Sequence, residues 1–414
     1  MTDSLAVRGT ALTLADIPDE PDWERMRREI GARLRTAMTE HGVDALILLM
    51  NGHVGYATGA TWPLLDAGLS HVERPVAVVL ADDEHPHLFM PFRGGASAGA
   101  PVPDDHLHGP VYLEFDQGVR DFARTLADLI PHGAAVAVDE LTGAMRRGAA
   151  TLFPSGTPSD AAIVIAAAQL VKTRDEISCL RRACRITEQA MVDVQKALAP
   201  GVRQIDLSAT LVRRAFELGA TTNMLEAIWQ VMPSSREAGV WTTHGDLALP
   251  LLPTERELAA GDVLWTDISF GYAGYCSDFG RTWLVGEQPT RKQQDQFRQW
   301  RAILDAVLAV TKAGVTSGDL ARAAIAANGG RKPWLPHFYL GHGIGTYPAE
   351  PPMIGTDLGE EFDDNFVFPP GMLLVLEPVV WEDGTGGYRS EEIIVITEDG
   401  YLPITDYPYS PYGD

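Results

Sequence analysis

Two short segments that each place an aspartate beside apolar residues constrain this chain more than any other feature of its sequence. Val263–Ser269 is largely apolar and contains Asp267, and Cys276–Thr282 contains Asp278. A Gly- and Tyr-rich link separates the segments, so they are predicted to pair as a β-hairpin with both carboxylates on one side. Carboxylates that close together repel each other unless a cation lies between them. The hairpin therefore indicates either a catalytic acid pair or half of a metal site.

Three later stretches add further candidate metal ligands. His342 is flanked by glycines, and Glu377 ends an otherwise apolar run. Glu391 and Glu392 interrupt another apolar segment, and a buried charge needs a partner or a metal. Two Asp, one His and two Glu form a donor set that suits a pair of divalent ions such as Mn, Co, Zn or Fe(II).

The order of these residues resembles that of the pita-bread metallopeptidases, which include methionine aminopeptidase, aminopeptidase P, prolidase and creatinase. The resemblance covers roughly residues 165 to 400. It rests on five motifs in the same order: Thr266-Asp267, Ser277-Asp278-Phe279-Gly280-Arg281-Thr282, Gly341-His342-Gly343-Ile344-Gly345, Leu376-Glu377-Pro378 and Arg389-Ser390-Glu391. The first part of the chain looks like the creatinase/prolidase-type N-terminal domain. The resemblance implies an α/β creatinase-like domain over residues 1–165 and an α+β pita-bread catalytic domain over residues 166–414.

The resemblance also implies a role for each ligand. Asp267 chelates one metal, and Asp278 and Glu391 bridge the two metals. His342 and Glu377 hold the second metal, Glu377 also acts as a proton shuttle, and Glu392 is a neighbour rather than a ligand. Two such metals lower the pKa of a bridging water and polarise a carbonyl, so the expected reaction is hydrolysis of a small peptide or other C–N substrate. Xaa-Pro dipeptides and peptides are the expected class.

Substrate-handling residues are the part of the site where this chain departs from the family pattern. His244 is the candidate for the histidine that the family carries upstream of the first aspartate, and it is assigned a catalytic role. The second histidine of the family normally lies seven residues after His342, where this chain has Ala349. Glu350 or Tyr347 could substitute for it. Further candidates for substrate or supporting contacts are Arg389 and, as a proton relay, His337.

Ala349 motivates an alternative reaction. Branches of the family that have left peptide hydrolysis, such as dimethylsulfoniopropionate lyases and ectoine hydrolases, also depart from the peptidase pattern in this segment. The alternative is therefore a lyase or a small-molecule amidohydrolase. A binding protein that has lost catalysis is a third hypothesis, and the intact ligand set argues against it.

Hydrophobic periodicity outlines the same two parts of the chain. Apolar residues at helical spacing predict a helix over 22–41, and residues 51–59 are predicted to form a loop. A second helix is predicted near 118–130, and strands are predicted over 44–50, 75–81, 88–92, 111–115 and 134–139. This alternation favours a small α/β domain, and a long amphipathic helix beginning near Lys172 opens the second part.

Two histidine pairs resemble metal-binding pairs by spacing alone. They are His85 with His87, and His106 with His108. Both pairs are predicted to lie in polar loops without further ligands, so surface histidines are the preferred interpretation.

Composition narrows the partners and the compartment. The formal net charge of −23 argues against nucleic acid or an anionic membrane as a partner. The three cysteines include no C-x-x-C pair, and no basic, then apolar, signal segment occurs, so a reducing cytoplasm is expected. No apolar run approaches the roughly 20 residues that span a bilayer. The resemblance further implies a homodimer.

Overall fold

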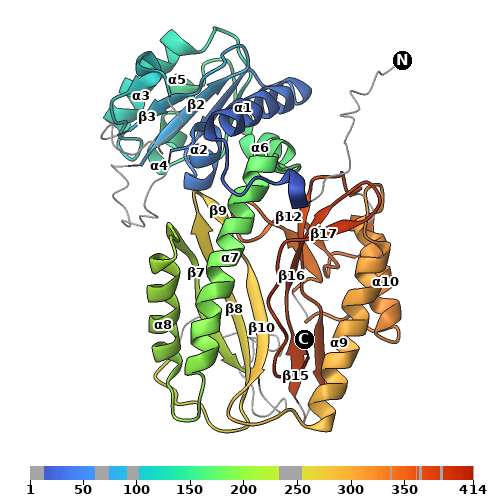
Figure 1. The fold of residues 1–414 in the computed structure, drawn as a ribbon. Helices are drawn as coiled ribbons and strands as arrows, with labels where there is room; N and C mark the ends of the chain where they lie inside the picture. Colours follow the sequence, from blue (N-terminus) through green and yellow to red (C-terminus); the bar gives the residue numbers. More distant parts are fainter. Residues whose placement is uncertain are drawn as a thin grey trace. The chain divides into compact units, whose positions relative to one another are not determined.

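The structure is a computed structural model that describes residues 14–60, 74–90, 102–232, 254–335, 338–359, 361–362, 366–382 and 386–413. The chain divides into two compact units. One is Glu20–Asp175, and the other is Met1–Asp19 together with Glu176–Asp414 (Figure 1). Residue 165 lies within helix α6 (Ala161–Gln169) of the Glu20–Asp175 unit. Among the described residues, none of the helices has the length and apolar character needed to cross a membrane.

The Glu20–Asp175 unit is built on a mixed six-stranded sheet with the order β4-β3-β2-β1-β5-β6. Its strands are β1 (Ala45–Leu48), β2 (Val76–Leu80), β3 (His87–Phe89), β4 (Leu107–His108), β5 (Val136–Val138) and β6 (Ser159–Asp160). The β1–β2 and β2–β3 pairs are antiparallel, and the β1–β5, β3–β4 and β5–β6 pairs are parallel. β1 is buried along its whole length because it lies in the middle of the sheet.

Helices pack against this sheet. Alternate residues of β1, Ala45 and Ile47, join one core cluster with Phe122 and Leu126 of α3. α1 and α6 contact each other, and α6 also contacts β1. The helices of the unit are α1 (Trp23–Glu40), α2 (Asn51–Thr58), α3 (Asp116–Leu129), α4 (Gly143–Arg147), α5 (Ala149–Leu152) and α6. The fold therefore alternates strands and helices, as the periodicity predicts.

Two sequence-based predictions for this unit are wrong. Residues 51–58 form helix α2 rather than a loop, because Gly59 ends the turn in a left-handed conformation and buried His53 bonds to Asp139 at 2.9 Å. Residues 111–115 form no strand. Leu113 is buried there, but Phe115 leads directly into α3, and the short strand β4 is the edge next to β3.

The prediction that these histidines lie at the surface is also wrong for His87, His106 and His108. His87 lies on β3 with only 6% of its surface exposed, and His106 and His108 are half-buried. β3 and β4 are parallel neighbours, so the chain brings both pairs to one edge of the sheet. Of the four, His85 alone is exposed.

The described residues of the second unit form three sheets. One has the order β10-β8-β7, with β9 also paired to β8, and its strands are β7 (Thr222–Val231), β8 (Val263–Tyr272), β9 (Tyr275–Cys276) and β10 (Phe279–Leu284). Another has the order β12-β11-β13-β16-β17, and its strands are β11 (Gly341–Gly343), β12 (Glu350–Ile354), β13 (Leu373–Leu376), β16 (Glu392–Ile396) and β17 (Tyr401–Pro403). β14 (Val379–Glu382) and β15 (Gly386–Arg389) form a two-stranded sheet.

Two helix pairs flank these sheets, as Figure 1 shows. α7 (Arg174–Ala197) and α8 (Gln204–Glu217) share a core cluster with β7, β8 and β10, through residues such as Met191, Leu211 and Trp283. α9 (Arg291–Val310) and α10 (Ser317–Ala327) contact each other, and α9 also contacts β14 and β15. Thr290 and Thr316 cap these two helices with complete capping boxes.

Candidate metal centre

The β8–β10 hairpin places the two aspartates close together but not directly opposite each other. Asp267 pairs with Gly280, and Asp278 lies just before β10 begins. Because side chains alternate along a strand, Asp278 is the diagonal neighbour of Asp267 on the same face. Gly280 leaves the position opposite Asp267 without a side chain. The Glu391 carboxylate fills that space, and a Cβ on Gly280 would lie 2.5 Å from Glu391 Oε1.

The other ligand candidates come from the five-stranded sheet. His342 lies on β11 between β12 and β13, and its flanking glycines let these strands approach closely. A Cβ on Gly341 would meet the carbonyl oxygen of Val375 at 2.3 Å. Glu377 follows the last residue of β13, and Glu391 precedes the first residue of β16. Both carboxylates therefore lie where a strand of this sheet ends or begins.

These side chains converge in one buried site. The carboxylates of Asp267, Asp278 and Glu391 each offer an oxygen, and these atoms lie within 4.8 Å of one another. His342 Nε2 lies 3.4 Å from Asp278 Oδ2 and 3.2 Å from Glu377 Oε1. His342 Nδ1 lies 2.8 Å from the carbonyl oxygen of Gly343, which can only accept, so Nδ1 donates and Nε2 faces the carboxylates. The structure thus brings all five predicted ligands together.

Arg389 is the positive charge among these carboxylates. Its Nη2 atom lies 3.0 Å from Asp267 Oδ2 and also contacts the carboxylates of Glu377 and Glu391. The guanidinium carbon lies 4.7 Å from the centre of the Trp265 ring, which supports the charge from one face. Arg389 therefore forms ion pairs with three carboxylates of the site and fixes their positions relative to one another.

Burial and crowding perturb the ionisation of the site. Burial, opposed by Arg389 and reinforced by Asp278 and Glu377, raises the pKa of Asp267 to about 6. Burial also raises the pKa of Glu391 well above its usual range. Burial opposes protonation of His342, but its contacts with Asp278 and Glu377 outweigh that cost and raise its pKa to about 10. For Glu377, burial is outweighed by Arg389 and His342, and the pKa is lowered. The cluster carries more negative charge than Arg389 alone can balance.

The residues present fit divalent metal ions. Glu391 Oε2 is buried and accepts no hydrogen bond from any described residue, which is a costly state for a carboxylate oxygen without a cation. Four carboxylates and one imidazole are the ligand types of Mn, Fe, Co and Zn sites. A divalent ion would take the lone pair of His342 Nε2 in place of the proton.

The remaining predicted residues lie in different surroundings. Ala349 is exposed in the loop between β11 and β12. The buried Glu350 carboxylate accepts from the backbone nitrogens of Thr346 and Tyr347 at 2.7 and 3.2 Å, so it holds this loop. His244 and His337 lie outside the residues that the structure describes.

Glu392 faces away from the ligand cluster. Its Oε1 atom accepts from Arg281 Nη2 at 3.0 Å and from Tyr409 at 2.7 Å. Because successive residues of a strand point to opposite faces, Glu391 and Glu392 separate at the start of β16. This placement agrees with its interpretation as a neighbour of the ligands.

Tyr339 and Arg281 contact the site in ways that the sequence does not predict. The ring of Tyr339 stands edge-on to the ring of His342, with the ring centres 5.2 Å apart. Burial, together with the charges of Glu377 and Asp278, raises the pKa of the Tyr339 phenol. Arg281 is buried and donates to the carbonyl oxygen of Glu391 at 2.6 Å. This bond links β10 to the residue that precedes β16. Arg281 lies inside a motif that the sequence shows, but its carbonyl partner is visible only in three dimensions. Tyr339 precedes His342 in an irregular segment that carries no pattern.

The fold and the buried carboxylate–imidazole cluster together define a metallohydrolase with a mixed α/β unit ahead of the unit that carries the site. Residues 178–398 match the model of metallopeptidase family M24, and residues 31–171 match that of the creatinase/prolidase N-terminal domain. Because the first match spans more than half of the chain, the chain belongs to metallopeptidase family M24. Membership implies divalent metal ions as cofactors and confirms the predicted combination of a creatinase-like domain and a pita-bread catalytic domain.

Similar proteins agree with this assignment. The chain is 27% identical to an uncharacterised peptidase, YqhT, of Bacillus subtilis over 91% of this chain and 97% of that protein. It is 25% identical to a Xaa-Pro dipeptidase of Lactobacillus delbrueckii over 90% of this chain and 95% of that protein. The crystal structure of the prolidase from Pyrococcus horikoshii shares the fold, with a TM-score of 0.71, 21% identity, and coverage of 92% of this chain and 99% of that one.

Proposed function

We propose that this chain is a dinuclear, metal-dependent hydrolase of short Xaa-Pro peptides. The observation that carries the proposal is the convergence of five ligand-type side chains in one buried site with an unpartnered carboxylate oxygen. The Xaa-Pro dipeptidase named above, which aligns with nearly the whole chain, supports the substrate class.

Each ligand has a proposed position. Asp267 would chelate one ion, His342 and Glu377 would hold the other, and Asp278 and Glu391 would bridge them. The bridging assignment is supported by the place of Asp278 and Glu391, whose oxygens lie within 4.8 Å of Asp267. Mn, Co, Zn and Fe(II) all accept this donor set.

The chemistry that the ions supply when bound is a lowered pKa of bound water and polarisation of the scissile carbonyl. The protein supplies the proton transfer and the surroundings. Glu377 is kept ionised by Arg389 and His342, so its Oε1 atom can accept the proton of the attacking water and pass it to the leaving nitrogen. Arg389 fixes the carboxylates of Asp267, Glu377 and Glu391 in one geometry. His244 is proposed to contact the substrate.

The direct test is proline release from Xaa-Pro dipeptides and from longer Xaa-Pro peptides. The full chain is treated with EDTA, then supplied separately with Mn²⁺, Co²⁺, Zn²⁺ and Fe²⁺, and assayed against an Xaa-Ala dipeptide as the matched substrate control. We expect metal-dependent cleavage of the Xaa-Pro bond and little cleavage of the control. If none of the four ions supports Xaa-Pro cleavage, the peptidase assignment is wrong.

Ala349 favours a second candidate function, a lyase of the dimethylsulfoniopropionate type or a small-molecule amidohydrolase. The exposed methyl group of Ala349 cannot bond to a substrate, and the neighbouring Glu350 carboxylate is committed to the loop backbone. Position 349 thus lacks the imidazole that the peptidases of the family use at the peptide bond. A screen of small zwitterions with detection of a volatile sulfide tests the lyase hypothesis. If no volatile sulfide is detected, the lyase hypothesis is excluded.

Restoring the histidine separates the two candidate functions. If the chain is a peptidase that works without this imidazole, Ala349→His should raise kcat/KM on Xaa-Pro dipeptides by about 100-fold or more, because one positioned acid–base group contributes about 10²- to 10⁴-fold. Ala349→Ser, which changes the side chain without adding an imidazole, is the control. An Ala349→His variant no better than wild type would favour the non-peptidase branch.

Domain limits, assembly and compartment are part of the same proposal. We propose a creatinase-like domain over residues 1–165 and a catalytic domain over residues 166–414. A homodimer and a cytoplasmic location are proposed from the family resemblance and from the use of three buried cysteines without a C-x-x-C pair. Light scattering of the full chain measures the oligomeric state, and a monomer would contradict the dimer.

A further inference from the structure

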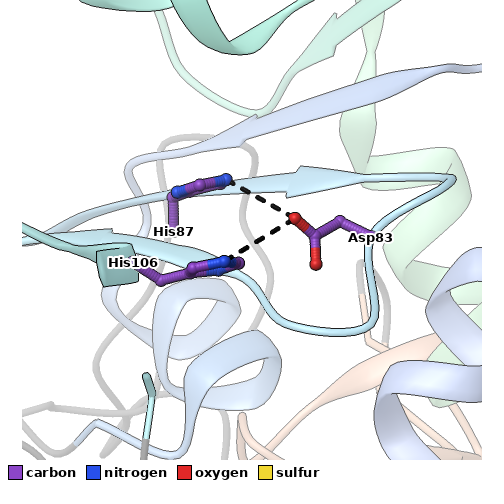
Figure 2. Close-up of side chains that lie close together, drawn as sticks. All are labelled: Asp83, His87 and His106. Carbon is purple, nitrogen blue, oxygen red and sulfur yellow. Dashed lines mark ion pairs between the residues drawn. The ribbon is translucent and has the colours of Figure 1, made fainter. Parts of the chain in front are cut away.

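A second cluster of metal-ligand side chains lies in the Glu20–Asp175 unit, apart from the proposed catalytic residues. Asp83 occupies the turn after β2, His87 lies on β3, and His106 ends the short 3₁₀ helix Asp104–His106. Figure 2 shows the three side chains pointing toward one another, with the Asp83 carboxylate facing both rings. None of these residues takes part in the proposed hydrolysis.

The distances suit ligands of one ion better than an ion pair. Asp83 Oδ2 lies 3.7 Å from His87 Nε2 and 3.8 Å from His106 Nε2, too far for hydrogen bonds. The ligand atoms of all three residues lie within 4.8 Å of one another. An ion with bonds of about 2.1 Å in tetrahedral geometry separates its ligand atoms by about 3.4 Å. A rotation of the two stacked rings that points both Nε2 atoms at one place would close the cluster around an ion.

The remaining hydrogen bonds orient these ligands. The backbone nitrogen of His85 donates to Asp83 Oδ1 at 3.0 Å, which turns Oδ2 toward the imidazoles. His87 Nδ1 lies 3.0 Å from His108 Nε2, so His87 can donate there and keep the lone pair of Nε2 for an ion. Histidines that bind metals ordinarily donate their second ring nitrogen to such a partner. His108 itself stacks on Phe89, with ring centres 4.4 Å apart.

The packing and exposure of the cluster also favour a metal. The His87 and His106 rings stack 4.1 Å apart, with an angle of 6° between their planes, and both face the Asp83 carboxylate. The His87 and His106 side chains are 8% and 15% exposed, but 30% of the Asp83 side chain is exposed, which leaves water access on one side.

We propose that Asp83, His87 and His106 bind one divalent transition-metal ion, of which Zn²⁺ is the representative, with His108 as the positioning residue. Two imidazoles and one carboxylate are ligand types that suit Zn²⁺, and they leave a further coordination position for water or a small ligand. His85 takes no part in coordination; its ring stands edge-on to His106 at 6.0 Å. The site shares no residue with the proposed catalytic centre.

Zinc content of variants of the full chain tests this proposal. Each protein is stripped with EDTA, dialysed against the same low-micromolar Zn²⁺ buffer at pH 7.5, and analysed for bound zinc by mass spectrometry. Asp83→Asn and His106→Gln should each bind one equivalent less than wild type, because each removes one of three ligands. His85→Gln is the matched control and should bind as much as wild type.

The proposed catalytic ligands are unchanged in all of these variants. Zinc bound by the catalytic ligands therefore contributes equally to every measurement. Asp83→Asn keeps the shape of a partly exposed side chain, so it tests the proposal even if His106→Gln does not fold. Wild-type zinc content in Asp83→Asn would overturn the proposal. A loss of one equivalent of zinc in His85→Gln would overturn the proposal as well. Zinc binding would then depend on a histidine that the proposal excludes from coordination.

Discussion

Gly280 is the residue on which the geometry of the proposed catalytic centre depends most. It faces Asp267 across the β8–β10 hairpin, and its missing side chain leaves the space that Glu391 enters from the neighbouring sheet. A Cβ would lie 2.5 to 2.8 Å from three atoms of the Glu391 side chain. The backbone nitrogen of Glu391 also donates to the carbonyl oxygen of Gly280 at 3.0 Å, so Glu391 cannot withdraw freely.

We expect Gly280→Ala to lower kcat/KM by about 100-fold, because displacement of a catalytic group by about 1 Å costs roughly that factor. The variant should also lose metal affinity in equilibrium dialysis. Gly271→Ala, on the same hairpin, is the control, since its Cβ would meet only the flexible side chain of Met224 and Thr222 at 3.3 Å or more. Full activity in Gly280→Ala would show that Glu391 is not a ligand.

At the residue scale, the sequence predicts which residues are candidate ligands better than it predicts which residues meet in space. Asp267, Asp278, Glu377 and Glu391 could be named from the sequence because charged residues beside apolar runs stand out, and His342 could be named because glycines flank it. The role of Gly280 could not, because the atom it makes room for comes from a segment more than a hundred residues later. The histidine cluster was misinterpreted for the same reason: the β3–β4 pairing that assembles it is not visible in either pair alone.

At the scale of elements, α7 carries a carboxylate whose ionisation opposes folding. Glu188 is half-buried, and its Oε1 atom accepts from the backbone nitrogen of Asp406 at 2.7 Å. Burial raises its pKa to about 7, with the Asp406 hydrogen bond and Arg281 acting against that shift. The folded protein therefore holds a proton on Glu188 at pH values where the unfolded chain, with a pKa near its ordinary value of 4.5, has lost it.

Stability contributed by this group is present below about pH 4.5 and is lost as pH rises toward 7. We therefore expect the Tm of Glu188→Gln, measured relative to wild type in EDTA, to increase between about pH 5 and pH 7 and to level off above that. Glu217→Gln on the exposed face of α8 checks that removing one negative charge does not produce the same trend. A Tm difference between Glu188→Gln and wild type that is independent of pH would contradict the assigned ionisation.

Elements with strong periodicity were predicted well, and those that depend on context were not. Buried residues at helical spacing defined α1 and α3, and apolar runs defined β1, β2 and β5. Helix α2 contains glycines and lacks a hydrophobic stripe, so its stability comes from tertiary contacts, such as the bond between His53 and Asp139 and the burial of Tyr56. Residues 111–115 have strand composition, but the sheet edge beside β3 is taken by β4.

At the scale of the whole molecule, the two compact units carry proposed sites of opposite ligand character. The Glu176–Asp414 part of the chain supplies four carboxylates and one imidazole, whereas Glu20–Asp175 supplies two imidazoles and one carboxylate. Oxygen-rich sites suit Mn²⁺, and nitrogen-rich sites suit Zn²⁺. The formal net charge of −23 favours attraction of cations to both. Manganese is therefore the ion that best separates the proposed catalytic centre from the second site.

The central claim, that five residues hold a pair of divalent ions, is tested most directly by anomalous diffraction from crystals of the full chain grown with Mn²⁺. Data collected at the manganese absorption edge should show two peaks among Asp267, Asp278, His342, Glu377 and Glu391. A single peak there would contradict the dinuclear centre. The absence of any peak among these side chains, with manganese bound elsewhere, would contradict the assignment of the site itself.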